Sequence, residues 1–236
     1  MSKALPYHQD THDHRDTHRT GASSNRRGFG GWPTFGLMAA MWMALALYTN
    51  GRVLTPEKLM ALATQGEGMA IAPDQVDFLQ RLEWLSYGLL PVMLALRVAI
   101  TALILQLFAM LLSAETGYRD LFRASLWGFS AVLYGMFIQM VRLDLLGPGI
   151  TVAELTVVPD SLAALILNPA PTLSMGYSAL SLLSIHGLLW IGIIFTYLRF
   201  EHRLTPRTAL LVPLAAWGTI SLAQLGLQAF TVQILG

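Results

Sequence analysis

The sequence has no cysteine, and this absence excludes disulfide bonds, thiolate catalysis and cysteine-ligated metals. Charge is scarce as well: Asp, Glu, Lys and Arg make up 12% of the 236 residues, whereas soluble domains carry about 25%. So little charge could not cover the surface of a water-soluble globule of this length. The chain also lacks a Gly-rich phosphate loop, a nucleophile elbow and a zincin helix, so no residue is assigned to catalysis, to a cofactor or to a metal.

The sequence instead has long apolar runs, and apolar residues reach 54% of the chain. Each run approaches or exceeds the ~20 residues that a helix needs to cross a bilayer. No Asp or Glu lies within the runs, and only Arg97 and His186 carry a basic group. We therefore predict an all-α, polytopic integral membrane bundle of five transmembrane helices with short interfacial helices. The runs are Gly31–Thr49, Leu85–Leu112, Ala124–Val141, Leu173–Leu198 and Thr208–Ile234.

The first 30 residues form a separate region, a polar tail that precedes the transmembrane domain of residues 31–236. The tail is no secretory signal, because no short apolar core follows its start. Its composition cannot bury enough apolar area to fold, so we expect disorder. Four histidines and three aspartates crowd the run His8–His18. We interpret this run as solvated, with weak or adventitious binding of Zn, Ni or Cu as the first alternative and a dedicated metal site as the second.

Basic residues mark one side of the predicted membrane domain. Arg26 and Arg27 stand directly before the first apolar run, and the positive-inside rule places them in the cytoplasm. The tail and the two predicted inner loops hold ten Lys and Arg residues, whereas two longer outer loops hold four. We expect a bacterial cytoplasmic membrane protein with its N-terminus in the cytoplasm and its C-terminus outside. The inner basic clusters are too sparse to indicate nucleic-acid binding, and they suit contact with anionic lipids.

Prolines predict where the helices begin and break. Thr55-Pro56-Glu57 and Ala72-Pro73-Asp74 both resemble helix starts, and the second would lead an amphipathic helix along the outer surface into the second span. Pro91 and Arg97 divide that 28-residue second run, so we expect a kink or an interfacial segment there. The Asn168–Pro171 break leaves Ser161–Leu167 as a short interfacial or re-entrant helix.

Polar residues within the runs are the candidates for a functional site. A charge at the bilayer centre costs roughly 2.5–3.5 kcal/mol, so Arg97 either snorkels, pairs with Asp144 or Glu83, or lines a substrate path. His186, placed in the middle of the fourth span, either forms an interhelical hydrogen bond or relays protons. Glutamines complete this possible intramembrane polar site as hydrogen-bonding or cavity-lining residues: Gln106, Gln139 and Gln224, with Gln228 nearby.

Small residues recur at four-residue spacing, which lets helices approach closely in lipid. We expect these residues to pack helices within the bundle or between subunits. They are Gly36, Ala40 and Ala44 in the first span, Ala131 and Gly135 in the third, and Ala215, Thr219 and Ala223 in the fifth. Ser184 and Gly187, three residues apart, make a related small face in the fourth span.

The second to fifth spans resemble the Yip1 domain family of five-span membrane proteins. The resemblance rests on the loop Ser113–Ala124, on Leu167–Ser174 and the helix that follows, and on Arg203–Val212 with Trp217. It implies a five-span fold with a cytoplasmic N-terminus. Eukaryotic members act in membrane trafficking and bind small GTPases through their cytoplasmic part, but the tail here carries no matching motif. Only fold and topology are therefore carried over, and the style of tail and loops is bacterial.

From these observations we expect a non-enzymatic membrane protein that acts through helix–helix contacts, as an adaptor or a subunit of a membrane assembly. Its expected partners are membrane lipids and other membrane subunits, or further copies of itself. The alternative is a transporter or permease component that uses Arg97 and His186. A membrane enzyme would need acidic, His or Cys groups paired at one depth, and the apolar runs contain no Asp or Glu.

Overall fold

The computed structural model describes residues 31–53, 55, 73–147, 155, 157–167 and 175–235. The His-rich tail, the helix start expected around Pro56 and the break expected at Asn168–Pro171 lie outside these residues. The regular elements of the described part are all helices, apart from one isolated antiparallel bridge between Ser161 and Ser184. The prediction of an all-helical bundle is confirmed for this part of the chain.

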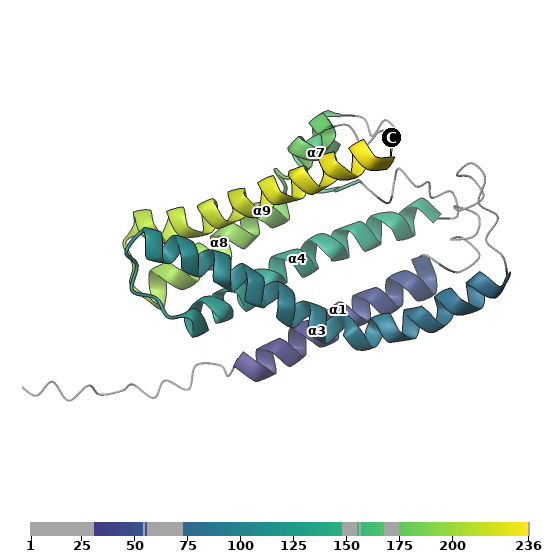
Figure 1. The fold of residues 1–236 in the computed structure, drawn as a ribbon, viewed down its shortest axis with the longest axis horizontal. Coiled ribbons are helices and arrows are strands. Elements are labelled where there is room, and N and C mark those ends of the chain that lie inside the picture. The colour runs from purple at the N-terminus through teal and green to yellow at the C-terminus, as the bar shows by residue number, and fades with distance from the viewer. Residues whose placement is uncertain are drawn as a thin grey trace, which may run out of the picture.

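The long helices pack around α4 (Figure 1). Helix α4 contacts α1, α3 and α8, and α9 lies against both α8 and α3. The long helices are α1 (Gly31–Tyr48), α3 (Pro73–Leu111), α4 (Tyr118–Leu146), α8 (Ile185–Phe200) and α9 (Pro206–Leu235). Shorter elements are η1 (Thr49–Val53), α6 (Leu162–Ile166) and α7 (Met175–Ser181).

Three helical segments of the described chain are long and apolar enough to cross a membrane: Tyr87–Leu111, Tyr118–Leu146 and Pro206–Leu227. Helix α8 is apolar but has 16 residues, and α1 has 18. At a rise of about 1.5 Å per residue, α8 alone extends about 24 Å, less than the ~30 Å hydrocarbon core. The five-span count therefore stays a prediction, whereas membrane-capable helices are present.

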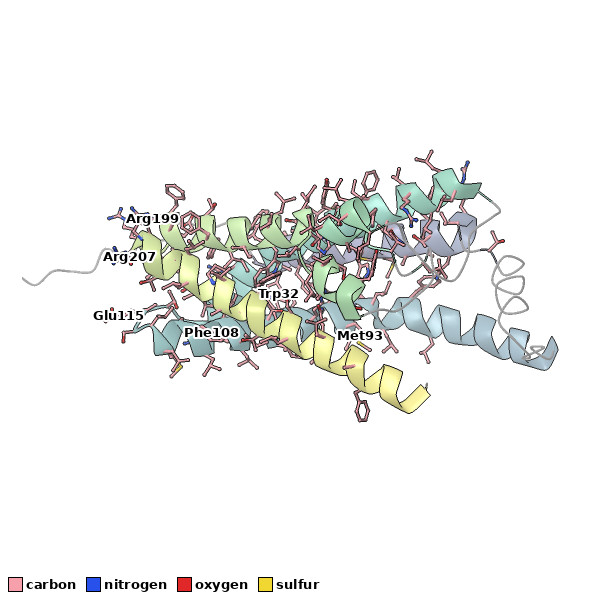
Figure 2. The ribbon with its side chains drawn as sticks, turned by 90° about the horizontal axis from the view of Figure 1, so that it is seen from above. Trp32, Met93, Phe108, Glu115, Arg199 and Arg207 are labelled. Atoms are coloured by element: carbon pink, nitrogen blue, oxygen red, sulfur yellow. The ribbon has the colours of Figure 1, made fainter. Side chains whose placement is uncertain are left out.

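The apolar residues divide between a core and an outward face. Leu105, Leu121 and Ile194 are fully buried where α3, α4, α8 and α9 meet. Apolar side chains also project from the outside of the bundle (Figure 2). Leu111 and Leu222, for example, are 69% and 71% exposed. In water such a surface would form an extended exposed apolar patch, which is unfavourable. In a membrane the same side chains would contact lipid instead of water.

Helix α3 begins at Pro73, one of the two helix starts expected from the sequence, and it runs through Pro91 as one element of 39 residues, so the amphipathic segment and the second span are a single helix. One expectation about helix continuity was wrong. The run Leu173–Leu198 is divided, because α7 ends at Ser181 and α8 begins at Ile185. His186 therefore lies in the first turn of a helix and not in the middle of a span.

The predicted inner loops lie at the same end of the bundle. One loop joins α3 to α4, the other joins α8 to α9, and Glu115, Arg199 and Arg207 mark this end in Figure 2. We call it the basic end, because the chain places Arg119, Arg123, Arg199, Arg203 and Arg207 there.

Candidate functional site

A cavity of about 450 Å³ lies between α3, α4, α8 and α9, next to the gap between α7 and α8. Apolar rings and aliphatic side chains form much of its wall, including Phe129, Trp190 and Trp217. Its polar lining comes from helices far apart in the sequence. These polar residues are Arg97, Thr101, Ser125, Ser181, Ser184, His186, Ser221 and Gln224. We call this space the polar cavity.

The gap between α7 and α8 has a local cause. Ser184 is the N-cap of α8, and its hydroxyl accepts a hydrogen bond from the Gly187 amide at 3.2 Å. Backbone hydrogen bonds between the gap and the start of α6 satisfy the neighbouring peptide groups. The Leu162 amide donates to the Leu183 carbonyl at 2.8 Å, and the Ile185 amide donates to the Asp160 carbonyl at 3.0 Å. Irregular backbone at membrane depth is tolerated where protein covers it or where it lines a cavity, and this gap fits that condition.

Asp160, His186 and Ser184 form a continuous hydrogen-bonded chain at the start of α8. The buried Asp160 carboxylate lies 2.8 Å from His186 Nδ1, and it also accepts from the His186 amide at 2.9 Å. The other ring nitrogen, Nε2, lies 3.2 Å from the Ser184 hydroxyl. Because the carboxylate is an acceptor, the network assigns the proton to Nδ1 and leaves Nε2 as acceptor for the Ser184 O–H.

Two glycines allow α4 and α9 to approach this chain. A Cβ atom at Gly135 of α4 would lie 3.0 Å from His186 Cγ, closer than such atoms normally come. A Cβ atom at Gly187 would lie 3.2 Å from both Trp217 Nε1 and Ser184 Oγ. Small residues therefore set the position of the histidine ring against α4, as small-residue packing does in membrane bundles.

Arg97 lies at the same level of the bundle as His186. Arg97 stands 14 residues before the end of α3 and His186 stands 14 residues before the end of α8, about 21 Å along each helix from the basic end. The guanidinium lies 5.8 Å from the centre of the Phe129 ring, within cation–π range. Among the described residues it forms no ion pair, and Asp144 instead accepts from the Tyr48 hydroxyl at 3.3 Å.

The structure gathers three of the five predicted polar residues in this cavity: Arg97, His186 and Gln224. The other two glutamines lie elsewhere. Gln106 donates to the Thr116 carbonyl and Gln139 donates to the Leu155 carbonyl, each at 3.4 Å.

The predicted small residues separate into two groups. Ala131, Ser184 and Gly187 are buried inside the bundle, and Gly135 is half-buried against His186. The other group faces outward: Gly36, Ala40, Ala44, Thr219 and Ala223 are exposed, and Ala215 is half-buried. On α9 the neighbouring Ala216 is the small residue that faces the core.

Sequence reasoning missed Asp160 and Ser125 as site residues. Asp160 precedes the N-cap of α6 and lies 26 residues from His186, so no helical spacing connects them. Ser125 is 2% exposed, lines the polar cavity, and its hydroxyl has no hydrogen-bond partner among the described residues. A single serine within an apolar run gives no sequence signal.

The order Ser184–His186–Asp160 matches the order of contacts in a serine–histidine–aspartate triad. Acyl transfer also needs free donors for the developing oxyanion. The first four amides of α8 are all used: Ile185 and His186 donate to Asp160, and Gly187 and Leu188 donate to Ser184. The hydrogen bonds among Asp160, His186 and Ser184 are therefore suited to holding the start of α8 and the imidazole in place. The imidazole also lines the polar cavity, where a solute could contact it.

Neither a protein-family model, nor a curated protein, nor a solved structure matches this chain. The function is therefore argued from the geometry of the polar cavity.

Proposed function

We propose that this protein is a transporter or permease component that binds a small anionic solute in the polar cavity. The observation that carries the proposal is Arg97, an exposed cation of α3 that lines the polar cavity and has no ion-pair partner among the described residues. An unneutralised charge in the bilayer costs roughly 2.5–3.5 kcal/mol. A bound anion would offset part of that cost, so the site favours negatively charged solutes.

The gap between α7 and α8 supports the same proposal. Interrupted helices in transporters direct the positive N-terminal end of a half-helix toward an anionic substrate group. Here the first turn of α8 contributes Ser184, His186 and Gly187 to the cavity wall. The Asp160 carboxylate already occupies the N-terminus of α8, so the attraction for an anion comes from Arg97. Ser125 and Gln224 supply neutral groups that could hydrogen-bond the solute.

Solute uptake into proteoliposomes tests the proposal. Vesicles with the purified chain are assayed one solute at a time with radiolabelled inorganic phosphate, a short monocarboxylate and a short dicarboxylate. We expect uptake of at least one, and a reduction of about tenfold or more with Arg97→Gln, since loss of a charge-assisted contact exceeds ~1.4 kcal/mol. Arg207→Gln at the basic end is the matched control and should leave uptake unchanged. No uptake of any of the three, or equal uptake by Arg97→Gln, would overturn the proposal.

A second candidate function is that of an adaptor or subunit, through contacts with another membrane subunit or a second copy. It is favoured by the outward face of α1, where Gly36, Ala40 and Ala44 are exposed and a Cβ atom at Gly36 would meet nothing within 4 Å. Oligomeric mass in mild detergent, measured by light scattering, tests it. Gly36→Leu should lower the mass if this face pairs, whereas Gly218→Leu on α9 should not; a monomeric wild-type chain without a bound subunit would exclude it.

The Yip1 resemblance adds a proposed five-span topology in a bacterial cytoplasmic membrane, with the N-terminus inside and the C-terminus outside. The basic end, with its Arg-rich loops, would then face the cytoplasm.

A further inference from the structure

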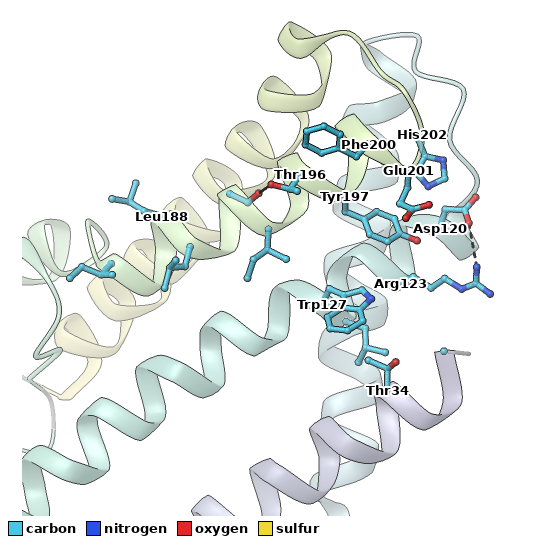
Figure 3. Close-up of a pocket in the computed structure, with 16 residues that line it drawn as sticks. Thr34, Asp120, Arg123, Trp127, Leu188, Thr196, Tyr197, Phe200, Glu201 and His202 are labelled. Atoms are coloured by element: carbon cyan, nitrogen blue, oxygen red, sulfur yellow. Dashed lines mark hydrogen bonds and ion pairs between the residues drawn. The ribbon is translucent and has the colours of Figure 1, made fainter. Parts of the chain in front are cut away.

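A groove of about 930 Å³ runs along α8, between α4 and the start of α1. It is separate from the polar cavity and belongs to the other side of α8. Figure 3 shows its lining, with Leu188 toward one end and Tyr197, Glu201 and His202 toward the other. We call it the α8 groove.

The α8 groove has an apolar length that suits one acyl chain. Ile185, Leu188, Leu189 and Ile193 line it along successive turns of α8. From Ile185 to Tyr197 the helix rises about 18 Å, close to the ~15 Å of one leaflet's share of the hydrocarbon core. Gly192 lies between these residues, and a Cβ atom there would meet nothing within 4 Å, so the groove is open at its middle.

The groove ends in a group of charged side chains at the basic end (Figure 3). Arg123 and Asp120 of α4 lie 3.9 Å apart, a loose pair that leaves both side chains about one-third exposed. Glu201 is exposed and follows the last turn of α8. His202 packs against the Tyr197 ring at 5.6 Å between centroids, and its buried Nε2 atom has no hydrogen-bond partner among the described residues.

We infer that the α8 groove binds a glycerophospholipid with a primary-amine headgroup. The lipid phosphate would lie at Arg123, and the ammonium at Asp120 and Glu201. Among the residues that line the groove, Asp120 and Glu201 outnumber Arg123, the single arginine, so the lining itself has no surplus positive charge for an anionic headgroup. A quaternary ammonium has no N–H to donate to the carboxylates, whereas a primary ammonium has three. The acyl chain follows the apolar residues of α8.

Native mass spectrometry of the full delipidated chain tests the headgroup. Phosphatidylethanolamine, phosphatidylglycerol and phosphatidylcholine are added separately at equal concentration. We expect tightest binding of phosphatidylethanolamine. Glu201→Gln should abolish that preference, and Arg123→Gln should weaken binding of all three by about tenfold. Glu115→Gln and Arg207→Gln, charged residues of the same end outside the groove, are the controls. Equal or tighter binding of phosphatidylglycerol, or effects of the controls equal to those of the groove variants, would overturn the inference.

Filling the groove tests its location. Gly192→Leu should weaken phosphatidylethanolamine binding severalfold without lowering the melting temperature. Gly218→Leu, at a position equally free of contacts, should leave phosphatidylethanolamine binding unchanged. Undiminished binding by Gly192→Leu places the lipid elsewhere and overturns the inference. Deletion of residues 2–25 tests a rival occupant: if only the shortened chain binds lipid, the chain's own N-terminal segment fills the groove and the inference is wrong.

Discussion

Gly135 sets the distance between α4 and the imidazole of His186. A methyl group there would lie 3.0 Å from Cγ and 3.1 Å from Nδ1 of that ring, so either the ring or helix α4 would have to shift. We predict that Gly135→Ala lowers the free energy of unfolding by about 1–3 kcal/mol, the usual range for overpacking. Thermal unfolding in detergent measures the change.

The matched control is Gly218, where the same substitution should raise the free energy of unfolding. It is also helical, but a Cβ atom there meets nothing within 4 Å, so Gly218→Ala should stabilise the helix by roughly 0.5–1 kcal/mol. Equal melting temperatures for the two variants would contradict the close approach of α4 to His186.

Asp160 stabilises the start of α8 twice, through its carboxylate and through its backbone carbonyl. Asp160→Ala keeps the carbonyl but leaves the His186 amide and the Nδ1 proton without acceptors. Since an unsatisfied buried donor costs about 1–3 kcal/mol, we predict a loss of stability in that range, and a smaller loss for Asp160→Asn, which keeps one oxygen. Chemical unfolding followed by Trp fluorescence measures both. Asp144→Ala, which loses only a contact of 3.3 Å with the exposed Tyr48, should change little; a similar loss there would show that Asp160 has no special role.

At the scale of a helix, the N-cap decides where α8 begins. Ser184→Ala removes the acceptor of the Gly187 amide, and N-cap serines contribute about 0.5–2 kcal/mol. We predict faster amide exchange confined to the first turn of α8. Ser130→Ala is the matched control, because the Ser130 hydroxyl bonds only its own turn, to the Trp127 carbonyl at 2.7 Å. Hydrogen exchange read by mass spectrometry distinguishes the two, and an unchanged first turn in Ser184→Ala would disprove the capping role.

The gap between α7 and α8 separates the elements that could be predicted from the sequence from those that could not. Apolar runs define α1, α3, α4 and α9 well, because length and hydropathy are properties of the local sequence. The division of Leu173–Leu198 could not be found this way, since the gap residues are themselves apolar or small. Its cause is Asp160, which satisfies the amides of Ile185 and His186 from a segment 26 residues away from the histidine. A hydropathy profile contains no term for such a partner.

The sequence also predicts the polar cavity only in part. Arg97 and His186 stand out because their side chains contradict an apolar run, and the structure brings both to one cavity. Ser125 gives no such contrast, because serine is common in membrane helices. The glutamines were equivalent in the sequence, and only the packing of α9 and α3 decides that Gln224 lines the cavity while Gln106 bonds the Thr116 carbonyl.

At the scale of the whole molecule, lipid and solute would act on different sides of α8. The polar cavity lies on the side shared with α3 and α9, and the α8 groove lies on the side of α1. Helix α8 has 16 residues and is held at its start by Asp160 and at its end by a bond from Arg199 to the Leu204 carbonyl at 2.7 Å. A solute in the polar cavity and a lipid in the α8 groove would therefore both contact α8, a short helix that is held at both ends.

The orientation of the molecule can be tested directly because the chain has no cysteine, so one introduced thiol gives one labelling site. Glu115 lies in the loop at the basic end, and Leu145 is 83% exposed near the other end of α4. We predict that a membrane-impermeant maleimide labels Leu145→Cys in intact cells, and labels Glu115→Cys only after the membrane is permeabilised, since Arg-rich loops stay in the cytoplasm. Ala216→Cys, fully buried in the core, is the control and should stay unlabelled in both conditions. Labelling of Glu115→Cys in intact cells would reverse the orientation, and labelling of both exposed thiols there would mean that α4 does not cross the bilayer.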